Sequence, residues 1–71
     1  MKCKVEAFWD GEAKVWVANS DDVPGLATEA NSLETLTKKL HNIIPELMLA
    51  NNIIPSNYTR KICLELVTHL Q

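Results

Sequence analysis

The sequence predicts an α+β domain with the element order β-β-β-α-β, in which an antiparallel sheet packs one face against one long helix. Residues 2–9 and 14–19 alternate between polar and apolar side chains on either side of a turn, as the strands of a hairpin do. Residues 33–47 repeat apolar side chains at helical spacing. Residues 62–70 alternate again, which predicts a final strand.

The length and composition of the chain indicate one small folded domain over residues 1–71. Apolar residues make up 46% and charged residues 23%, a balance that is typical of globular proteins and argues against disorder. A domain of this size buries only about 60% of its unfolded surface, so its stability is expected to be marginal.

The first two strands are predicted to form a hairpin with two different faces. Asp10-Gly11 is the turn signal, and a loop of two or four residues gives the same alignment of the strands. One face is almost wholly apolar and is expected to meet the core; it comprises Cys3, Val5, Ala7, Trp9, Trp16 and Ala18. The opposite face holds Lys2, Lys4, Glu6, Phe8, Val15 and Val17.

Phe8, Val15 and Val17 are the candidate residues for binding a partner or a second copy of the chain. A solvated sheet face normally carries polar side chains, and an apolar patch on it can mark a protein contact. The alternative is ordinary cross-strand pairing with nothing bound.

The segment after the hairpin is predicted to turn and then lead into the helix. Pro24-Gly25 suits the centre of a type II turn, because proline presets φ and glycine accepts a positive φ. Residues 26–30 follow as a short strand, whose low apolar content indicates a sheet edge or a position under a large neighbour. Ser32 is expected to cap the helix.

The helix is predicted within residues 31–52, with Pro45 in its interior. Its buried stripe is expected to consist of Leu33, Leu36, Leu40, Ile43, Ile44 and Leu47. Pro45 removes one hydrogen bond and clashes with the carbonyl of His41, at a cost of about 3 kcal/mol. We expect one kinked helix, because the stripe keeps its phase across the proline; the alternative is a first helix that ends near Ile44.

A loop at residues 51–59 is predicted to lead to the last strand, at residues 60–70. Its two alternating sets are Ile62, Leu64, Leu66 and Leu70 on one side, and Cys63, Glu65, Val67 and His69 on the other. Thr68 is the polar residue on the apolar side of this strand.

The charge distribution narrows the kinds of partner. The formal net charge is −2 and the basic residues are scattered, whereas a nucleic-acid-binding protein usually carries a basic stripe. A mildly acidic domain suits a basic protein partner. No apolar run of about 18 residues could span a membrane, and no leader precedes the first strand, so a cytoplasmic location is expected.

No pattern in the sequence predicts an enzyme, a metal site or a cofactor. Cys3 and Cys63 form no CxxC motif and are interpreted as reduced strand residues. His41 and His69 stand beside no nucleophile in a recognisable arrangement. The acidic residues are interpreted as solvated charges at opposite ends of the hairpin rather than a metal cluster; they are Glu6, Asp10, Asp21, Asp22 and Glu29.

Phe8, Trp9 and Trp16 raise the alternative of RNA binding. Single-stranded bases stack on aromatic residues of a sheet, but such sites also need interleaved basic side chains. Only three lysines of the hairpin meet that need. Trp9 and Trp16 are therefore interpreted as core residues, and RNA is the weaker hypothesis.

The order of these motifs resembles the HicB-like antitoxin superfamily. That family typically shows a "(D/E)xPG" turn, a short strand, and a polar residue before a serine or threonine cap. The matching segments are Asp22-Val23-Pro24-Gly25, Leu26 to Ala30, and Asn31-Ser32-Leu33-Glu34. The chain looks especially like a small stand-alone branch of unknown function, in which "FWD", "VWVA", "DDVPGL" and "TEA" recur in this order. The resemblance covers about residues 4–51 and, loosely, the final strand.

The resemblance implies a three-stranded antiparallel sheet, a helix packed across it, and a final strand that joins the sheet. It also implies a non-enzymatic domain that binds and masks a HicA-like toxin, a small basic protein that cleaves RNA. Many such antitoxins carry a C-terminal DNA-binding segment, but the sequence ends at Gln71 without room for one, so DNA binding is not expected.

Three alternatives remain at this stage. The domain could bind itself as a homo-oligomer of unknown role. It could bind RNA, since a β-β-β-α order resembles part of a double-stranded RNA-binding domain. An RNase H-like vestige with enzymatic activity would need converging carboxylates, which the sequence does not show.

Overall fold

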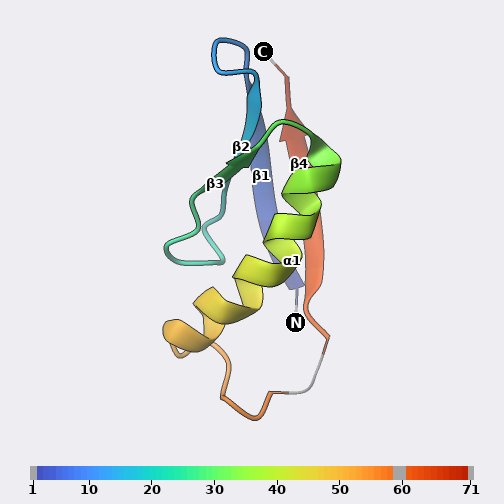
Figure 1. The fold of residues 1–71 in the computed structure, drawn as a ribbon. Helices are drawn as coiled ribbons and strands as arrows, with labels where there is room; N and C mark the ends of the chain where they lie inside the picture. The colour runs from blue at the N-terminus through green and yellow to red at the C-terminus, as the bar shows by residue number, and fades with distance from the viewer. Residues whose placement is uncertain (1, 59–60, 71) are drawn as a thin grey trace.

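A computed structural model describes residues 2–58 and 61–70 of the chain (Figure 1). The elements in this part of the chain, in order, are β1 (Lys2–Asp10), β2 (Val15–Asn19), β3 (Thr28–Ala30), α1 (Leu33–Ala50) and β4 (Cys63–His69). The four strands form one sheet in the order β3-β2-β1-β4, and α1 packs across one face of it. The predicted α+β architecture and element order are confirmed.

The fourth strand differs from the antiparallel arrangement that we expected. β1 to β3 pair antiparallel, but β4 runs parallel to β1, with Phe8 opposite His69. The sheet is therefore mixed. The reason is that α1 carries the chain back along the sheet, so β4 runs in the same direction as β3. β3 and β1 both pair antiparallel with β2, so β4 is also parallel to β1. β4 also begins three residues later than predicted, and Arg60 lies outside the described residues.

The hairpin loop spans residues 11–14, the longer of the two lengths considered. The Asp10 carboxylate accepts hydrogen bonds from the backbone N–H of Glu12, at 3.0 Å, and of Ala13, at 3.2 Å. Lys14 takes the left-handed conformation with φ of 56°, which allows the chain to enter β2. Asp10 thus holds the loop with its side chain, as an aspartate in a turn commonly does.

Two side chains after β2 extend the hydrogen bonding of β1. β2 ends opposite Glu6, so the backbone of Lys4 has no residue of β2 beside it. The Ser20 hydroxyl donates to the Lys4 carbonyl, and the Asp22 carboxylate accepts from the Lys4 N–H at 2.9 Å. Asp22 is exposed, as expected of a solvated loop charge, and its carboxylate also takes the place of a neighbouring strand.

The Pro24-Gly25 turn forms as predicted. Gly25 has φ of +81°, and the Leu26 N–H donates to the Val23 carbonyl at 3.2 Å, which closes the turn. Val23 and Leu26 are both buried, so the turn is anchored in the core on either side. β3 is three residues long and lies at the sheet edge next to β2, as its weak apolar content indicated.

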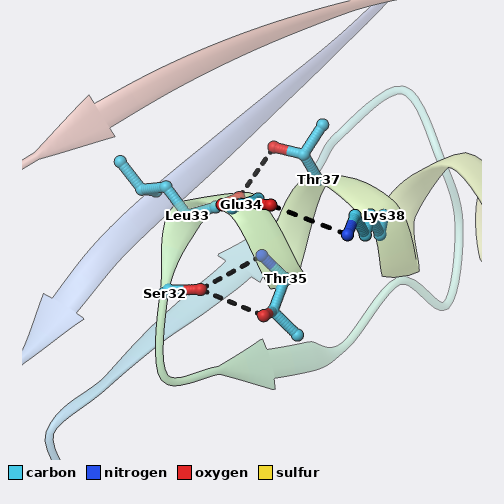
Figure 2. Close-up of polar contacts among 6 residues, drawn as sticks. All are labelled: Ser32, Leu33, Glu34, Thr35, Thr37 and Lys38. Atoms are coloured by element: carbon cyan, nitrogen blue, oxygen red, sulfur yellow. Dashed lines mark hydrogen bonds and ion pairs between the residues drawn. The ribbon is translucent and has the colours of Figure 1, made fainter.

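Ser32 caps the helix as predicted (Figure 2). Its hydroxyl oxygen accepts a hydrogen bond from the Thr35 N–H at 3.1 Å, and the same hydroxyl lies 3.0 Å from Thr35 Oγ1. Glu34 and Lys38 form an i,i+4 ion pair at 3.6 Å, but both side chains are largely exposed, so the pair adds little stability.

The helix is continuous from Leu33 to Ala50 and contains Pro45, so the proline does not split it. Its fully buried stripe is Leu36, Leu40, Ile44 and Met48. Met48 was not in the predicted stripe, whereas Leu33, Ile43 and Leu47 pack against the core only partly buried. The Asn51 side chain donates to the Leu47 carbonyl at 2.8 Å and to the Pro24 carbonyl at 3.3 Å, which ties the helix end to the turn.

The core lies between α1 and the inner face of the sheet. Cys3, Val5 and Ala7 of β1 are wholly buried there, and Ala18 of β2 is 1% exposed. Trp9 and Trp16 share this face, but both are only half-buried. The hairpin extends past the start of α1, so its far end lacks a helix above it, and the two rings pack on each other with centroids 5.4 Å apart instead.

The two cysteines lie in opposite environments and are expected to react differently. The Cys3 thiol contacts Met48 at 4.0 Å, and burial, with the nearby Asp22 charge, raises its pKa above its ordinary value of 9.0. Cys63 is exposed. Because the thiolate is the reactive form, iodoacetamide at pH 8 is expected to label Cys63 in the folded protein and both thiols in urea, as read by mass spectrometry. Rapid labelling of Cys3 in the folded protein would contradict this placement.

Candidate partner-binding surface

The sheet face opposite the helix carries the candidate surface. Figure 1 shows α1 on one side of the sheet, and no helix of the described residues covers the other side. This outer face holds alternate residues of every strand, because side chains alternate across a strand. A polar character is expected for such a face, so the apolar side chains on it require an explanation.

The structure places the three predicted residues together on the outer face. Phe8 of β1 lies directly opposite Val17 of β2, and Val15 lies one alternation further towards the hairpin loop. All three side chains are half-buried, although no helix packs on them. Their shielding therefore comes from neighbouring side chains on the same face.

β4 adds two residues that sequence reasoning did not include. Val67 lies opposite Glu6, and His69 lies opposite Phe8. The alternation within residues 62–70 already put both on one side of the last strand. The missing information was the pairing partner of that strand. We refer to Phe8, Val15, Val17, Val67 and His69 as the outer cluster.

His69 is held between an aromatic ring and a carboxylate. Its ring stacks on Phe8 with centroids 4.6 Å apart and an angle of 11° between the planes. Its Nε2 atom lies 3.4 Å from Glu6 Oε1, is shielded from solvent, and makes no hydrogen bond within the described residues. The two contacts hold the imidazole flat against Phe8, so these two rings present one continuous surface.

Charges of both signs surround the outer cluster. Lys2 and Glu65 form an exposed ion pair at 3.8 Å, Lys4 lies opposite Glu65, and Glu29 lies opposite Val17. With Glu6, and with Asp10 opposite Val15, the described residues of this face carry four carboxylates and two lysines. An apolar centre with a charged rim is the usual composition of a protein–protein interface.

A hollow of about 560 Å³ borders the outer cluster at the hairpin end. Phe8 and Val17 line it together with residues 9–12, where the loop begins. The hollow is wide open, so it is a shallow depression beside Phe8 rather than an enclosed pocket.

The remaining acidic and histidine residues do not meet in a reactive arrangement. Asp10 holds the hairpin loop, whereas Asp22 holds the other end of β1. In residues 2–58 and 61–70, no group of three potential ligands is placed to bind a metal ion. The contacts that define His69 are with Phe8 and Glu6, neither of which is a nucleophile of the Ser–His or Cys–His type.

A known protein family matches this chain over most of its length. Residues 2–71 match the family DUF1902, described as a domain of unknown function. The chain belongs to the DUF1902 family. The expectation of a small domain of unknown function is thus confirmed, whereas the match itself does not name the HicB-like superfamily. No match was found among curated proteins.

A solved relative supports the architecture of this DUF1902 domain. The chain is similar to a hypothetical protein from the extremely thermophilic bacterium Thermus thermophilus, whose crystal structure is known. The two are 48% identical, the match covers 97% of this chain and 93% of the other, and the TM-score is 0.80.

In the described part of this DUF1902 domain, no helix is both long and apolar enough to cross a membrane.

Proposed function

We propose that this DUF1902 domain is a non-enzymatic protein-interaction module that binds a partner through the outer cluster. The observation that carries this proposal is the stacked Phe8–His69 pair, which continues into Val17 and Val67 on a sheet face that α1 leaves uncovered. Burying apolar side chains of this kind is the main source of affinity in protein interfaces.

The partner that best fits is a HicA-like toxin. The motif order between the hairpin and the helix resembles HicB-like antitoxins, which bind such toxins. The charge of the chain is a second argument for this partner. The net charge is −2, and Glu6, Glu29 and Glu65 surround the outer cluster. A basic RNA-cleaving protein would meet complementary charges there, which favours fast and specific association.

A growth assay tests this proposal through the outer cluster. The gene in the neighbouring reading frame, where it encodes a small basic toxin-like protein, is expressed with and without this chain. Growth arrest is expected to be relieved by the parent chain. The Phe8→Glu variant is expected to lose the relief, because a charge at the centre of the interface must be desolvated without a partner. A pull-down is expected to show a loss of affinity of roughly a hundredfold, equal to about 2.7 kcal/mol.

The matched control is Ile53→Glu, which adds the same charge outside the outer cluster. Ile53 is 36% exposed and does not belong to the outer cluster. This variant is expected to relieve growth arrest as the parent does. Equal behaviour of the two variants, or no complex with any encoded toxin-like protein, would count against the antitoxin role.

Two other outcomes separate the alternatives. Sedimentation of the parent as an oligomer that Phe8→Glu or Val17→Lys converts into a monomer would assign the outer cluster to a second copy of the chain. A gel shift with RNA at low salt would assign it to nucleic acid, since charge attraction is strongest in dilute salt. The carboxylates on this face argue against the second outcome.

A further inference from the structure

A second surface lies on the helix side of the sheet, away from the outer cluster. It is found between α1 and the edge strand β4. It is a groove with a cavity of about 290 Å³. Five of its lining residues come from α1, namely Leu40, His41, Ile44, Pro45 and Leu49. The other side is formed by Leu64 of β4 and by residues of the segment that precedes this strand, including Ile54, Ser56, Tyr58 and Ile62.

The groove opens at the β4 side of the sheet. None of the described residues of β1, β2 or β3 lines it, although all three strands contribute to the core. Leu64 lies on the inner face of β4, because it pairs with the buried Cys3. It is nevertheless only half-buried. The helix therefore covers the centre of the sheet fully and its β4 edge incompletely.

The backbone beside the groove is able to pair with another strand. β4 is the last strand of the sheet, seven residues long, and β1 is its neighbour on one side. A strand in this position presents N–H and C=O groups along its other side. The opposite edge is less available, because β3 has three residues and the Lys39 ammonium donates to its Glu29 carbonyl at 2.8 Å.

The helix beside the groove contains a backbone acceptor that lacks its regular partner. Pro45 has no N–H, so the His41 carbonyl lacks its regular helical partner one turn later. Both residues line the groove. Most of the other lining side chains are aliphatic, whereas Ser56 and Tyr58 carry hydroxyl groups. The groove thus combines apolar volume with the side-chain hydroxyl groups of Ser56 and Tyr58, which can hydrogen-bond an extended backbone.

We propose that the α1–β4 groove binds an extended, uncharged peptide segment of a partner protein, which adds to β4 as a fifth strand and places apolar side chains under α1. Main-chain hydrogen bonds to an edge strand supply affinity in this mode, and pockets for alternate side chains supply specificity. A cavity of this volume is at the lower end of ligand-binding sites, and suits one or two side chains better than a cofactor. This surface is separate from the outer cluster and does not rest on the proposed function.

The test uses a fluorescein-labelled octapeptide that alternates leucine and threonine between terminal lysines. Fluorescence anisotropy is expected to show saturable binding to the full chain. NMR shift changes are expected to concentrate in residues 40–49 and 63–69. Two derivatives, N-methylated on the leucines or on the threonines, are the decisive probes. Only one of them is expected to lose binding, because alternate N–H groups of an added strand face β4.

The variants separate this groove from the rest of the surface. Leu49→Glu is expected to weaken peptide binding by roughly tenfold or more. The matched control is Ile53→Glu, at a residue that is 36% exposed and does not line the groove; it is expected to bind as the parent does. Phe8→Glu is also expected to bind the peptide normally, so this proposal can fail or hold independently of the outer cluster.

Three results would overturn the proposal. Absence of binding at about 1 mM peptide, a concentration that detects interactions as weak as about −4 kcal/mol, is the first. Equal binding of both N-methylated peptides is the second, because it would assign the groove to a small apolar ligand without strand addition. Dimerisation of the chain that the peptide does not disrupt, with shift changes along residues 63–69, is the third, because it would assign β4 to a second copy.

Discussion

Replacing Leu40 with alanine is expected to lower the free energy of unfolding by about 2–5 kcal/mol, which is the cost of deleting a fully buried leucine side chain. Leu40 is 0% exposed at the centre of α1 and belongs to the single apolar cluster identified between helix and sheet in the described residues. A domain of 71 residues has a total stability of roughly 4–10 kcal/mol. The substitution therefore removes a large part of what holds the chain folded.

Urea titration followed by circular dichroism measures this effect. The midpoint is expected to fall sharply for Leu40→Ala, and a fraction of the variant is expected to be unfolded before urea is added. The matched control is Leu49→Ala, the same change on the same helix at a residue that is 42% exposed. It is expected to cost less than about 1 kcal/mol. Similar losses at the two positions would show that the helix does not pack on the sheet through the Leu36–Leu40–Ile44 stripe.

Replacing Pro45 with alanine is expected to change stability in the opposite direction. Alanine restores the N–H that the His41 carbonyl lacks and removes the ring that clashes with it, a difference of about 3 kcal/mol in a helix interior. Two effects offset part of this gain: the half-buried ring loses contacts, and the unfolded chain regains the freedom that proline denies it, worth about 0.4–1 kcal/mol. The net expectation is a stabilisation of about 1–2 kcal/mol.

Thermal unfolding of Pro45→Ala beside Glu46→Ala checks this expectation. Glu46 is the next residue of α1 and is exposed, so its replacement is expected to change stability by about 0.5 kcal/mol or less. A melting temperature that rises only for Pro45→Ala agrees with the helical argument. A lower melting temperature would show that packing of the proline ring in the α1–β4 groove outweighs the lost hydrogen bond.

The two surfaces differ in how far the sequence could predict them. Phe8, Val15 and Val17 were identified from alternation alone, because a period of two assigns residues to a face once a strand is recognised. His69 was not, since its place beside Phe8 depends on which strand β4 pairs with and in which register. The groove was not predicted either, because its lining joins α1, β4 and the segment between them.

Two aspartates show that the sequence predicts local contacts but not contacts between distant residues. Asp10 was correctly placed in the hairpin turn, where its carboxylate accepts from residues two and three positions later. Asp22 contacts Lys4 across 18 positions, and no local pattern indicates such a bond. Both aspartates lie beside loops. They differ because Asp10 bonds residues next to it in the sequence, whereas Asp22 bonds a residue that is far away in the sequence.

By itself, the sequence determined what depends on neighbours along the chain. The strands and their two faces, the Pro24-Gly25 turn, the Ser32 cap and a helix that continues through Pro45 all follow from periodicity and from backbone preferences. Only the tertiary structure decided the parallel pairing of β4, the contacts of His69 and Asp22, and the groove beside α1. The physical reason is that side-chain patterns record which face of an element is buried, whereas the choice of neighbour is made when distant segments close on one another.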